Sequence, residues 1–280
     1  MSAAHKPVPF SHLCCRARCR HCPPAVPACL RQQPRASPAA ARSPVSIPRI
    51  FHLTSPTTAL TWEERRIVAR LQRTLPGWTC KHWDDTANSA LMHRAFPHLA
   101  ARFDAIRFGV MKADIARYAY MHVDGGFYFD TDYKLLAALG PALLEQPCVL
   151  PIEEGALGQP DFKLGNAVFG SEAGHPFWAS LIEHIFVAHL PERLTDHRQI
   201  PMASGPRGLT NFYLSREGGF QGLHCPARDA FHPDRTWFGL GHRGGQIAVG
   251  SHLCWASWRG KSTRRAITNY LRRKLSALPI

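Results

Sequence analysis

The sequence of 280 residues contains no apolar run long enough to span a bilayer. Its first part also has no uninterrupted apolar segment of the length found in a signal peptide. We therefore expect neither a transmembrane segment nor a signal peptide, and a location in the cytoplasm or peripherally on a membrane. The nine cysteines form no evident disulfide framework, which agrees with a reducing compartment.

Acidic residues are missing from both ends of the chain. Residues 1–49 hold eight Lys or Arg and no acid, and residues 235–280 hold nine and no acid, although the whole chain carries a net charge of +14. The remaining 17 bases (34 − 17) face all 20 acids, so the middle of the chain has a net charge of −3. Because the positive charge is terminal, it does not by itself indicate a nucleic-acid-binding domain.

Residues 1–46 form a leader that is rich in Pro, Ala, Arg and Cys and lacks apolar periodicity, so we expect it to be disordered. Five cysteines crowd this leader, with His12 and His21 beside them: Cys14, Cys15, Cys19, Cys22 and Cys29. Such residues permit a zinc site, but they are too bunched to form the two separated pairs of a zinc finger or ribbon. We therefore expect no zinc domain here.

The folded domain is predicted to cover residues 47–258, in which strand and helix patterns alternate. Strands are expected at 47–53, 80–85, 126–129, 147–152 and 166–171, and helices at 61–73, 108–123 and 175–190. Alternation of this kind predicts an α/β domain with a mostly parallel central sheet flanked by helices, and ligands at the carboxyl ends of its strands.

Two aspartates lie one residue apart at such a strand end, in the stretch GGFYFDTDY. Alternate residues of a strand point the same way, so Asp130 and Asp132 are expected to direct both carboxylates into one small volume. Oxygen ligands of this kind suit Mg²⁺ or Mn²⁺. The alternative is an ordinary solvated Asp-Thr-Asp turn that ends a strand.

A second pair of polar residues precedes this stretch on the predicted helix 108–123. Asp114 and Arg117 are three residues apart and therefore share a helix face, with the carboxylate suited to sugar hydroxyls and the guanidinium to hydroxyl or phosphate oxygens. Taken alone, the pair is an ordinary helix-surface ion pair. Together with the Gly-Gly turn, the aromatic strand and Asp-x-Asp, it forms a more specific pattern.

This stretch resembles the sugar-binding region with an Asp-x-Asp motif of glycosyltransferase family 32, which includes clostridial glucosylating toxins and fungal Golgi mannosyltransferases. The likeness rests on the types and spacing of five residues: Asp114, Arg117, Tyr128, Asp130 and Asp132. Three segments agree with it: the opening strand IPRIFHL, the Gly-Pro segment ASGPRGLT, and HLCWASW with His252, Ser257 and Trp258. The resemblance spans about residues 47–258.

The resemblance implies a single GT-A type domain, a nucleotide-sugar donor, a divalent metal (Mn²⁺ or Mg²⁺) and transfer with retention of configuration. It implies catalytic roles for Asp130, Asp132 and Arg117, and a metal site formed by Asp130, Asp132 and His252. The donor-binding residues that it implies are Asp114, Arg117, Tyr128, Asp130, Ser257 and Trp258. Apart from the resemblance, Glu153 and Glu154 in PIEEG are candidates for contacts on the acceptor side, but two solvated loop acids are the preferred interpretation.

We therefore predict a metal-dependent retaining hexosyltransferase, with mannose as the suggested sugar and a glycan or glycolipid as acceptor. The alternatives are a metal-dependent phosphohydrolase, since Asp-x-Asp also suits aspartyl-phosphate chemistry, and a nucleic-acid-binding protein that uses its basic ends. No nucleic acid is expected among the partners, because no aromatic and basic groove or known module is present. Residues 259–280 are predicted to form a basic amphipathic helix, through which the protein would contact an anionic membrane.

Overall fold

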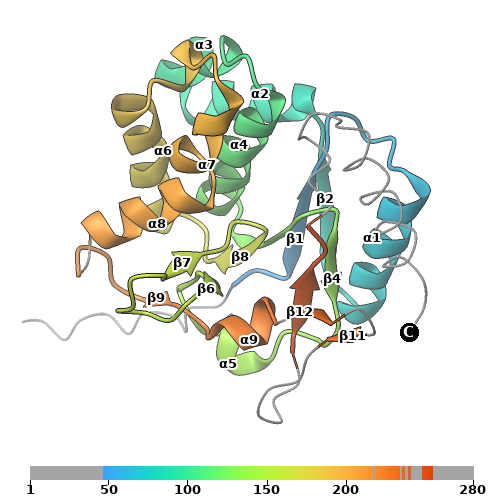
Figure 1. Ribbon diagram of the computed structural model, residues 1–280. Coiled ribbons are helices and arrows are strands. Elements are labelled where there is room, and N and C mark those ends of the chain that lie inside the picture. The colour runs from blue at the N-terminus through green and yellow to red at the C-terminus, as the bar shows by residue number, and fades with distance from the viewer. Residues whose placement is uncertain (1–46, 217, 234, 237–238, 241–247, 255–280) are drawn as a thin grey trace, which may run out of the picture. The chain divides into compact units, whose positions relative to one another are not determined.

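The computed structural model describes residues 47–216, 218–233, 235–236, 239–240 and 248–254 (Figure 1). All of them belong to one unit that spans Arg42–Ile280. The leader 1–46, the tail 259–280 and the two predicted donor contacts Ser257 and Trp258 lie outside the described residues. The predictions for these parts, and the domain boundaries at 46 and 258, therefore stay predictions.

A central sheet has the strand order β2-β1-β3-β8-β5-β9. Its strands are β2 (Thr79–Trp83), β1 (Ile50–Thr54), β3 (Gly126–Phe129), β8 (Val168–Ser171), β5 (Cys148–Val149) and β9 (Leu223–His224). β1 runs parallel to β2 and β3, and β5 runs parallel to β9, whereas β8 is antiparallel to β3 and β5. The predicted mostly parallel sheet is confirmed.

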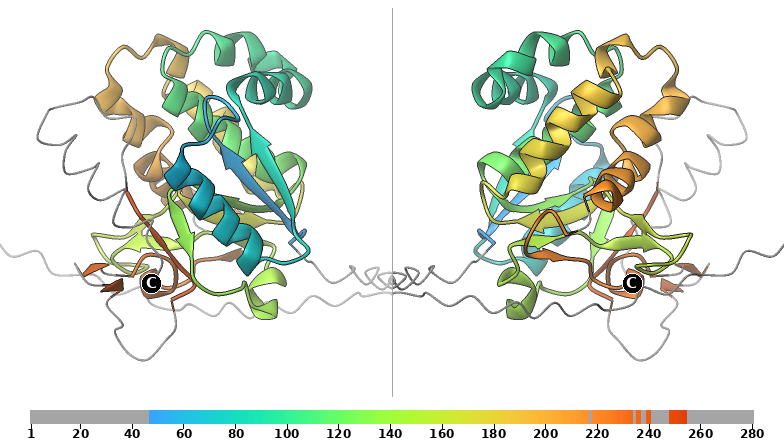
Figure 2. Two further views of the ribbon diagram at one scale, coloured as in Figure 1. Left: turned by 90° about the vertical axis from the view of Figure 1, so that its right-hand side faces the viewer. Right: turned by 90° about the vertical axis from the view of Figure 1, so that its left-hand side faces the viewer.

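Helices cover both faces of this sheet. Figures 1 and 2 show α1 (Trp62–Thr74) on one face and α2 (Asp85–Ala95), α4 (Gly109–Val123), α6 (Pro176–Ala188) and α8 (Pro206–Ser215) on the other. The remaining helices are α3 (Pro97–Asp104), α5 (Pro141–Leu144), α7 (Ile200–Ala203) and α9 (Arg228–Phe231), with 3₁₀ turns at Pro191–Arg193 and His197–Gln199. The predicted α/β class with flanking helices is thereby confirmed.

Three small two-stranded sheets complete the described part of the chain. They pair β4 (Tyr133–Leu135) with β12 (Gly250–His252), β6 (Ile152–Glu154) with β7 (Lys163–Leu164), and β10 (Arg235–Thr236) with β11 (Gly239–Leu240). The predicted strand 147–152 is thus two short strands that belong to different sheets. Among the described helices, none combines the length and apolar character that crossing a bilayer requires.

Strand alternation divides the core into two clusters. Phe127 and Phe129 of β3 pack with Leu71 of α1, whereas Tyr128, between them in the sequence, packs on the opposite face with residues of α4 and α6. β1 alternates likewise, because Phe51 and Leu53 belong to the α1 side. The residues between them therefore point toward α4, where the polar site is found.

Local sequence signals explain where the main helices begin and end. Thr61 and Glu64 form the predicted capping box at the start of α1. After α4, Gly125 and Gly126 both have positive φ, and a Cβ on Gly126 would collide with the backbone of Ile50. Helix α2, which the sequence pattern did not predict, begins directly after β2 because Asp84 caps it by accepting a hydrogen bond from the backbone of Ala87.

Candidate active site

The Asp-x-Asp motif forms the turn between β3 and β4, at the carboxyl end of the parallel strands. β3 ends at Phe129, and the backbone N–H of Tyr133 donates to the carbonyl of Asp130 at 2.9 Å, which closes the turn. The motif therefore does form the turn at the end of a strand that was considered as the alternative interpretation. Its side chains are not merely solvated, however, because Asp130 and Asp132 are only 21% and 13% exposed.

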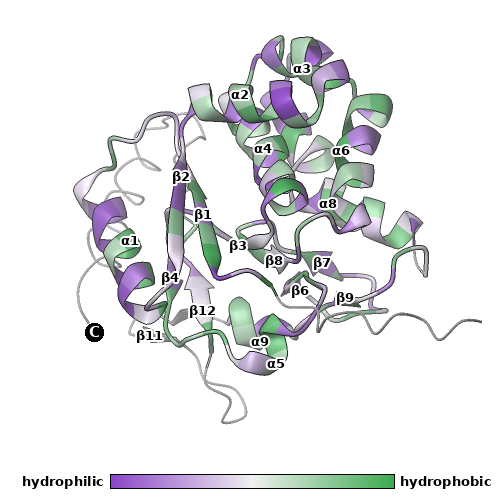
Figure 3. Cartoon of the chain, turned by 180° about the vertical axis from the view of Figure 1, so that it is seen from behind, coloured by the Kyte–Doolittle hydropathy of each residue, from purple (hydrophilic) through white to green (hydrophobic). Residues whose placement is uncertain are grey.

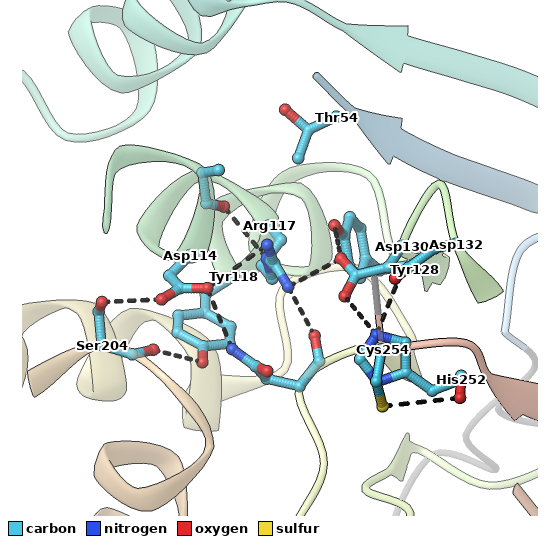
Figure 4. Close-up of polar contacts among 12 residues, drawn as sticks. Thr54, Asp114, Arg117, Tyr118, Tyr128, Asp130, Asp132, Ser204, His252 and Cys254 are labelled. Atoms are coloured by element: carbon cyan, nitrogen blue, oxygen red, sulfur yellow. Dashed lines mark hydrogen bonds and ion pairs between the residues drawn. The ribbon is translucent and has the colours of Figure 1, made fainter. Parts of the chain in front are cut away.

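His252 joins these two acids from a distant part of the sequence. β12 pairs with β4 so that His252 lies opposite Tyr133, and the N–H of Leu253 donates to the carbonyl of Asp132 at 2.8 Å. The Nε2 atom of His252 lies 3.1 Å from a carboxylate oxygen of Asp132 and 3.6 Å from one of Asp130 (Figure 4). The three residues predicted to hold the metal are thus neighbours.

The charge of His252 is determined by these neighbours. Burial opposes protonation, but the carboxylate of Asp132 outweighs it and raises the pKa of His252 well above its usual value. The second ring nitrogen, Nδ1, lies 3.4 Å from the Sγ atom of Cys254. In the absence of a cation, His252 therefore carries positive charge that compensates the two acids.

Arg117 reaches the Asp-x-Asp motif from α4 and lies between two acids, Asp114 on its own helix and Asp130 in the motif. Its guanidinium lies 3.0 Å from a carboxylate oxygen of Asp130 and 3.4 Å from one of Asp114, and it donates to the carbonyl of Asn166 at 2.9 Å. It also stacks over the ring of Tyr128, at 4.6 Å from the centroid, while the hydroxyl of Tyr128 donates to Asp130. Burial alone would lower the pKa of Arg117, but the carboxylates raise it further above its usual value.

Asp114 lies deeper than the motif itself. It is 4% exposed and accepts hydrogen bonds from Ser204 at 2.9 Å and from the side chain of Asn166 at 3.1 Å. Burial raises the pKa of Asp114 to about 6, although Arg117 opposes this shift. The hydroxyl of Tyr118 donates to the backbone of Ser204 at 2.7 Å, so that the loop before α8 is held against α4.

A second group of polar side chains lies at the ends of β1 and β2 and contains aromatic rings instead of charges. The indole N–H of Trp83 donates to Nδ1 of His52 at 3.0 Å, which requires that the proton of a neutral His52 be on Nε2. That Nε2 donates in turn to the carbonyl of Gly125 at 2.8 Å. Burial lowers the pKa of His52 to about 4, so the ring is neutral near pH 7.

Stacked rings continue this aromatic group toward α4. The ring of Tyr120 stacks on Trp83, with 4.8 Å between the centroids, and its hydroxyl donates to the side chain of Asn88. Asn88 donates to the hydroxyl of Thr54 at 3.0 Å, and Thr54 is the last residue of β1. The carboxyl edge of the sheet therefore has a charged half around Arg117 and a neutral half around Trp83.

The donor set at the motif suits a divalent cation. Asp130, Asp132 and His252 each offer one ligand atom, and these atoms lie within 4.8 Å of one another. Two carboxylate oxygens and one imidazole nitrogen form a mixed set that transition metals accept readily. A cation there would take over the compensating charge that a protonated His252 supplies. The predicted ligands therefore fit the predicted metal in kind and in placement.

The two glutamates considered for the acceptor side lie on β6, and both face Lys163 of β7. The Nζ atom of Lys163 lies 3.7 Å from Glu153 and forms a shorter ion pair with Glu154. Burial raises the pKa of Glu153, whereas Glu154 is exposed. An acceptor role for either residue stays a hypothesis.

Several residues that shape this site were not predicted from the sequence. Ser204 and Asn166, which bind Asp114, lie in the segments ASGPRGLT and NAVFGS, but neither segment signals by itself that its polar residue is turned toward Asp114. The predicted strand 80–85 likewise contains Trp83, whose position beside His52 depends on the pairing of β1 with β2. The roles predicted for the site residues in catalysis, donor binding and metal binding stay predictions.

The segment that forms this geometry is similar to a known protein family. Residues 62–150, which include α4, β3 and the turn, match the model described as a glycosyltransferase sugar-binding region containing a DXD motif. This part of the chain is thus similar to the glycosyltransferases that carry the region. The resemblance to family 32 is thereby confirmed over these residues.

Two curated fungal proteins are similar to this chain. Inositol phosphoceramide mannosyltransferase 3 of Schizosaccharomyces pombe is 24% identical over 152 residues, which cover 52% of this chain and 40% of the relative. Mannosyl phosphorylinositol ceramide synthase CSH1 of Saccharomyces cerevisiae is 26% identical over 142 residues, which cover 51% of this chain and 36% of the relative. The chain thus spans less than half the length of both relatives.

Two solved glycosyltransferase structures are similar to this chain over part of its length, at low sequence identity. The PaToxG glycosyltransferase has a TM-score of 0.49 at 13% identity, covering 63% of this chain and 72% of its own. A glycosyltransferase involved in the glycosylation of the major capsid of PBCV-1 has a TM-score of 0.36 at 10% identity, covering 80% of this chain and 98% of its own. The expected GT-A type fold agrees with the sheet and flanking helices found here.

Proposed function

We propose that this glycosyltransferase moves a hexose from a nucleotide-sugar to a glycan or glycolipid acceptor, with retention of configuration and with the help of a divalent metal. The observation that carries the proposal is the convergence of Asp130, Asp132 and His252 beside the buried guanidinium of Arg117. The names of the two curated relatives favour mannose as the sugar and a lipid-linked acceptor.

Each residue has a distinct task in this proposal. Asp130, Asp132 and His252 would hold the metal, and the imidazole favours Mn²⁺ over Mg²⁺, which prefers oxygen ligands. The metal, when bound, would stabilise the negative charge that develops on the departing nucleoside diphosphate. Arg117 and Asp114 would orient the donor sugar, and Ser257 and Trp258 would contact the donor phosphates.

Arg117 suits this task because its position is determined before any donor binds. Its three hydrogen-bonding partners and the ring of Tyr128 restrict the guanidinium to one orientation. A positive charge held in this way needs little reorganisation when negative charge develops nearby. Binding of donor and metal at this edge of the sheet also agrees with the general placement of ligands at the carboxyl ends of strands. We propose a cytoplasmic or membrane-peripheral location and no nucleic-acid partner.

The experiment combines ligand binding with product analysis. A thermal-shift panel of UDP and GDP sugars with and without Mn²⁺ should give a shift for one donor class that depends on the metal, because a ligand at 100 times its Kd stabilises by about 2.7 kcal/mol. Asp132→Asn should remove this shift and the turnover while leaving the fold intact. Asp196→Asn, at an exposed ion pair with Arg198, is the matched control and should behave as the wild type.

Three kinds of result would contradict the proposal. Full activity of the wild type in EDTA, or of Asp132→Asn with Mn²⁺, would exclude the metal site. Release of free phosphate without a new glycoside would favour a phosphohydrolase instead. A salt-sensitive gel shift with nucleic acid that leaves the Mn²⁺ response unaffected would favour the nucleic-acid-binding alternative.

A further inference from the structure

The two ring nitrogens of His252 face different partners. Nε2 lies 3.1 Å from a carboxylate oxygen of Asp132, whereas Nδ1 lies 3.4 Å from the Sγ atom of Cys254. Figure 4 shows the carboxylate of Asp130 and the sulfur of Cys254 on different sides of the imidazole ring. The contact with Cys254 is therefore made by the nitrogen that is turned away from the two acids.

This geometry excludes Cys254 as a fourth ligand of the candidate metal site. The lone-pair directions of Nδ1 and Nε2 lie in the ring plane and diverge, so one cation can be bound by only one of the two nitrogens. The acids lie at the Nε2 edge of the ring and the thiol lies at the Nδ1 edge. Accordingly, the group of possible ligands among the described residues contains Asp130, Asp132 and His252 but not Cys254.

The backbone of the segment brings the thiol back toward the ring. Cys254 has a φ of 50°, in the left-handed region that a residue with a side chain seldom adopts. Its Sγ atom also lies 3.7 Å from the carbonyl oxygen of His252, to which the S–H group donates. Between the two residues, the N–H of Leu253 donates to the carbonyl of Asp132 at 2.8 Å. The segment is therefore tied to the Asp-x-Asp turn and folded back on His252.

β12 fixes the backbone of His252. The strand contains no strongly hydrophobic residue, as its pale colour in Figure 3 shows, and His252 pairs with Tyr133 of β4. A Cβ on Gly250 would collide with the ring of Tyr133, so the two strands approach this closely only because residue 250 is glycine. Strand pairing does not determine the rotation of the imidazole ring, however. Side-chain contacts must therefore orient the ring.

The thiol of Cys254 can serve as such a contact without changing its charge. Its S–H donates to the carbonyl of His252, which leaves the lone pairs of sulfur to accept the N–H of Nδ1. A neutral imidazole that carries its proton on Nδ1 has its free lone pair on Nε2. That lone pair then faces Asp130 and Asp132, where a cation would be bound.

We propose that Cys254 is a positioning residue for the metal ligand His252. By accepting the N–H of Nδ1, it holds the tautomer and the ring orientation in which Nε2 faces the two acids. Histidines that bind metals usually donate their other N–H to a carboxylate, a carbonyl or a water, and here a thiol takes that place. Cys254 lies in HLCWASW but is not among the residues of that segment that carry the resemblance to family 32. The proposal rests on the proposed function, because it requires a cation at this site.

Binding of Mn²⁺ to the full chain, without any donor, tests this role independently of turnover. The EPR signal of free Mn²⁺ measures the Kd, and Mn²⁺ is a better probe than Zn²⁺, which the five leader cysteines would also bind. Loss of an outer partner of a ligating histidine weakens metal binding by about 10–100-fold, so Cys254→Ala should raise the Kd about 10-fold. Cys254→Ser should stay much nearer to the wild type, because a hydroxyl accepts the same hydrogen bond.

Two controls accompany these variants. Cys80→Ala makes the same chemical change at a half-buried position in β2 and should leave the Kd unchanged. Asp132→Asn gives the Mn²⁺ binding that remains elsewhere on the chain once a ligand of the site is lost. Thermal unfolding of all variants in EDTA should agree with that of the wild type, which shows that altered metal binding does not reflect altered folding.

A double-mutant cycle decides whether Cys254 acts through His252. His252→Ala should weaken Mn²⁺ binding, and adding Cys254→Ala to it should cause no further loss. Pulsed EPR supplies a second readout, the coupling of the imidazole nitrogen to bound Mn²⁺. This coupling should be present in the wild type, absent in His252→Ala and altered in Cys254→Ala, because the ring loses the contact that orients it.

The outcomes separate failure of this role from failure of the metal site. If Cys254→Ala binds Mn²⁺ as the wild type does while Asp132→Asn does not, the positioning role is wrong and the metal site stands. Equal losses in Cys254→Ala and Cys254→Ser, or additive losses in the double variant, would also overturn the role. Absence of Mn²⁺ binding in the wild type, or unchanged binding in Asp132→Asn, would contradict the proposed metal site and the role of Cys254 together.

Discussion

The two halves of the carboxyl edge differ in how they deal with burial of polar groups. Around Arg117, charge is retained and compensated by Asp114 and Asp130 in direct contact. Around Trp83, charge is avoided, since His52 is kept neutral by burial and by the hydrogen bond that it accepts. The charged half therefore places ionised groups at the carboxyl edge, whereas the neutral half places a stack of aromatic rings there.

Burial disfavours the charged form in both halves, and the halves differ in whether an opposite charge lies nearby. Burial raises the pKa of Asp114 to about 6 and lowers that of His52 to about 4, so in both cases it favours the neutral form. Only the charged half contains an opposite charge that resists this effect. Its stability therefore depends on each partner of the ion pair remaining in place.

The largest effect is expected when the charged half loses the guanidinium of Arg117. Arg117→Met leaves the carboxylates of Asp114 and Asp130 without their buried partner, and it should lower the free energy of unfolding by about 3–5 kcal/mol. Urea unfolding at pH 7 measures this change. Arg198→Met, which breaks an exposed pair with Asp196, should have no measurable effect. Equal stability of the two variants would show that the charges of the site are compensated in another way.

The next effect is the dependence of stability on pH, which differs between His52 in the neutral half and Asp114 in the charged half. The folded-state pKa of His52 is about 4 against an ordinary value of 6.5, so the unfolded chain takes up the proton first as the pH falls. His52 therefore contributes stability that is full above pH 6.5 and is lost toward pH 4. Asp114 has the opposite sign, because its pKa is raised from 3.8 to about 6 and its cost appears as the pH rises through that range. Each contribution is on the order of 3 kcal/mol.

Two variants separate these opposite changes of stability with pH. Compared with His52→Gln, the wild type should become more stable as the pH rises from 4 to 6.5. Compared with Asp114→Asn, it should become less stable over the range from about 4 to 6. Urea unfolding of the three proteins across these pH values gives both differences. If both stability differences changed with pH in the same direction, the assigned pKa shift of His52 or of Asp114 would be wrong.

The smallest effect concerns a single hydrogen bond in the charged half. Ser204→Ala removes a donor to Asp114 and should cost about 1 kcal/mol of stability. It should also raise the pKa of Asp114 further, because that bond favours the carboxylate. The carboxyl band in infrared titration measures the pKa. Ser171→Ala, a buried serine that donates only to backbone carbonyls, should leave this pKa where it is, and an equal shift in both variants would contradict the assignment.

Much of the fold could be predicted from local patterns. The capping box at Thr61 and the Gly-Gly stop after α4 involve neighbours in sequence, and the strand β3 follows from its aromatic run. Helix α2 was missed because its N-cap, Asp84, was assigned to the end of a strand. Within the site, the pair Asp114 and Arg117 could be found because helix periodicity places the two residues on one face. The pair Asp130 and Asp132 could be found because both belong to one short turn after β3.

The sequence by itself determined which residues meet along helix α4 and within the turn after β3, because these residues are close together in the chain. The tertiary structure alone decided that α4 presents Arg117 to Asp130, that β12 brings His252 to Asp132, and that Ser204 reaches Asp114. These contacts join residues far apart in the chain, and they depend on sheet register and helix packing. The same packing buries both Asp114 and His52, but it places only Asp114 within reach of a compensating opposite charge.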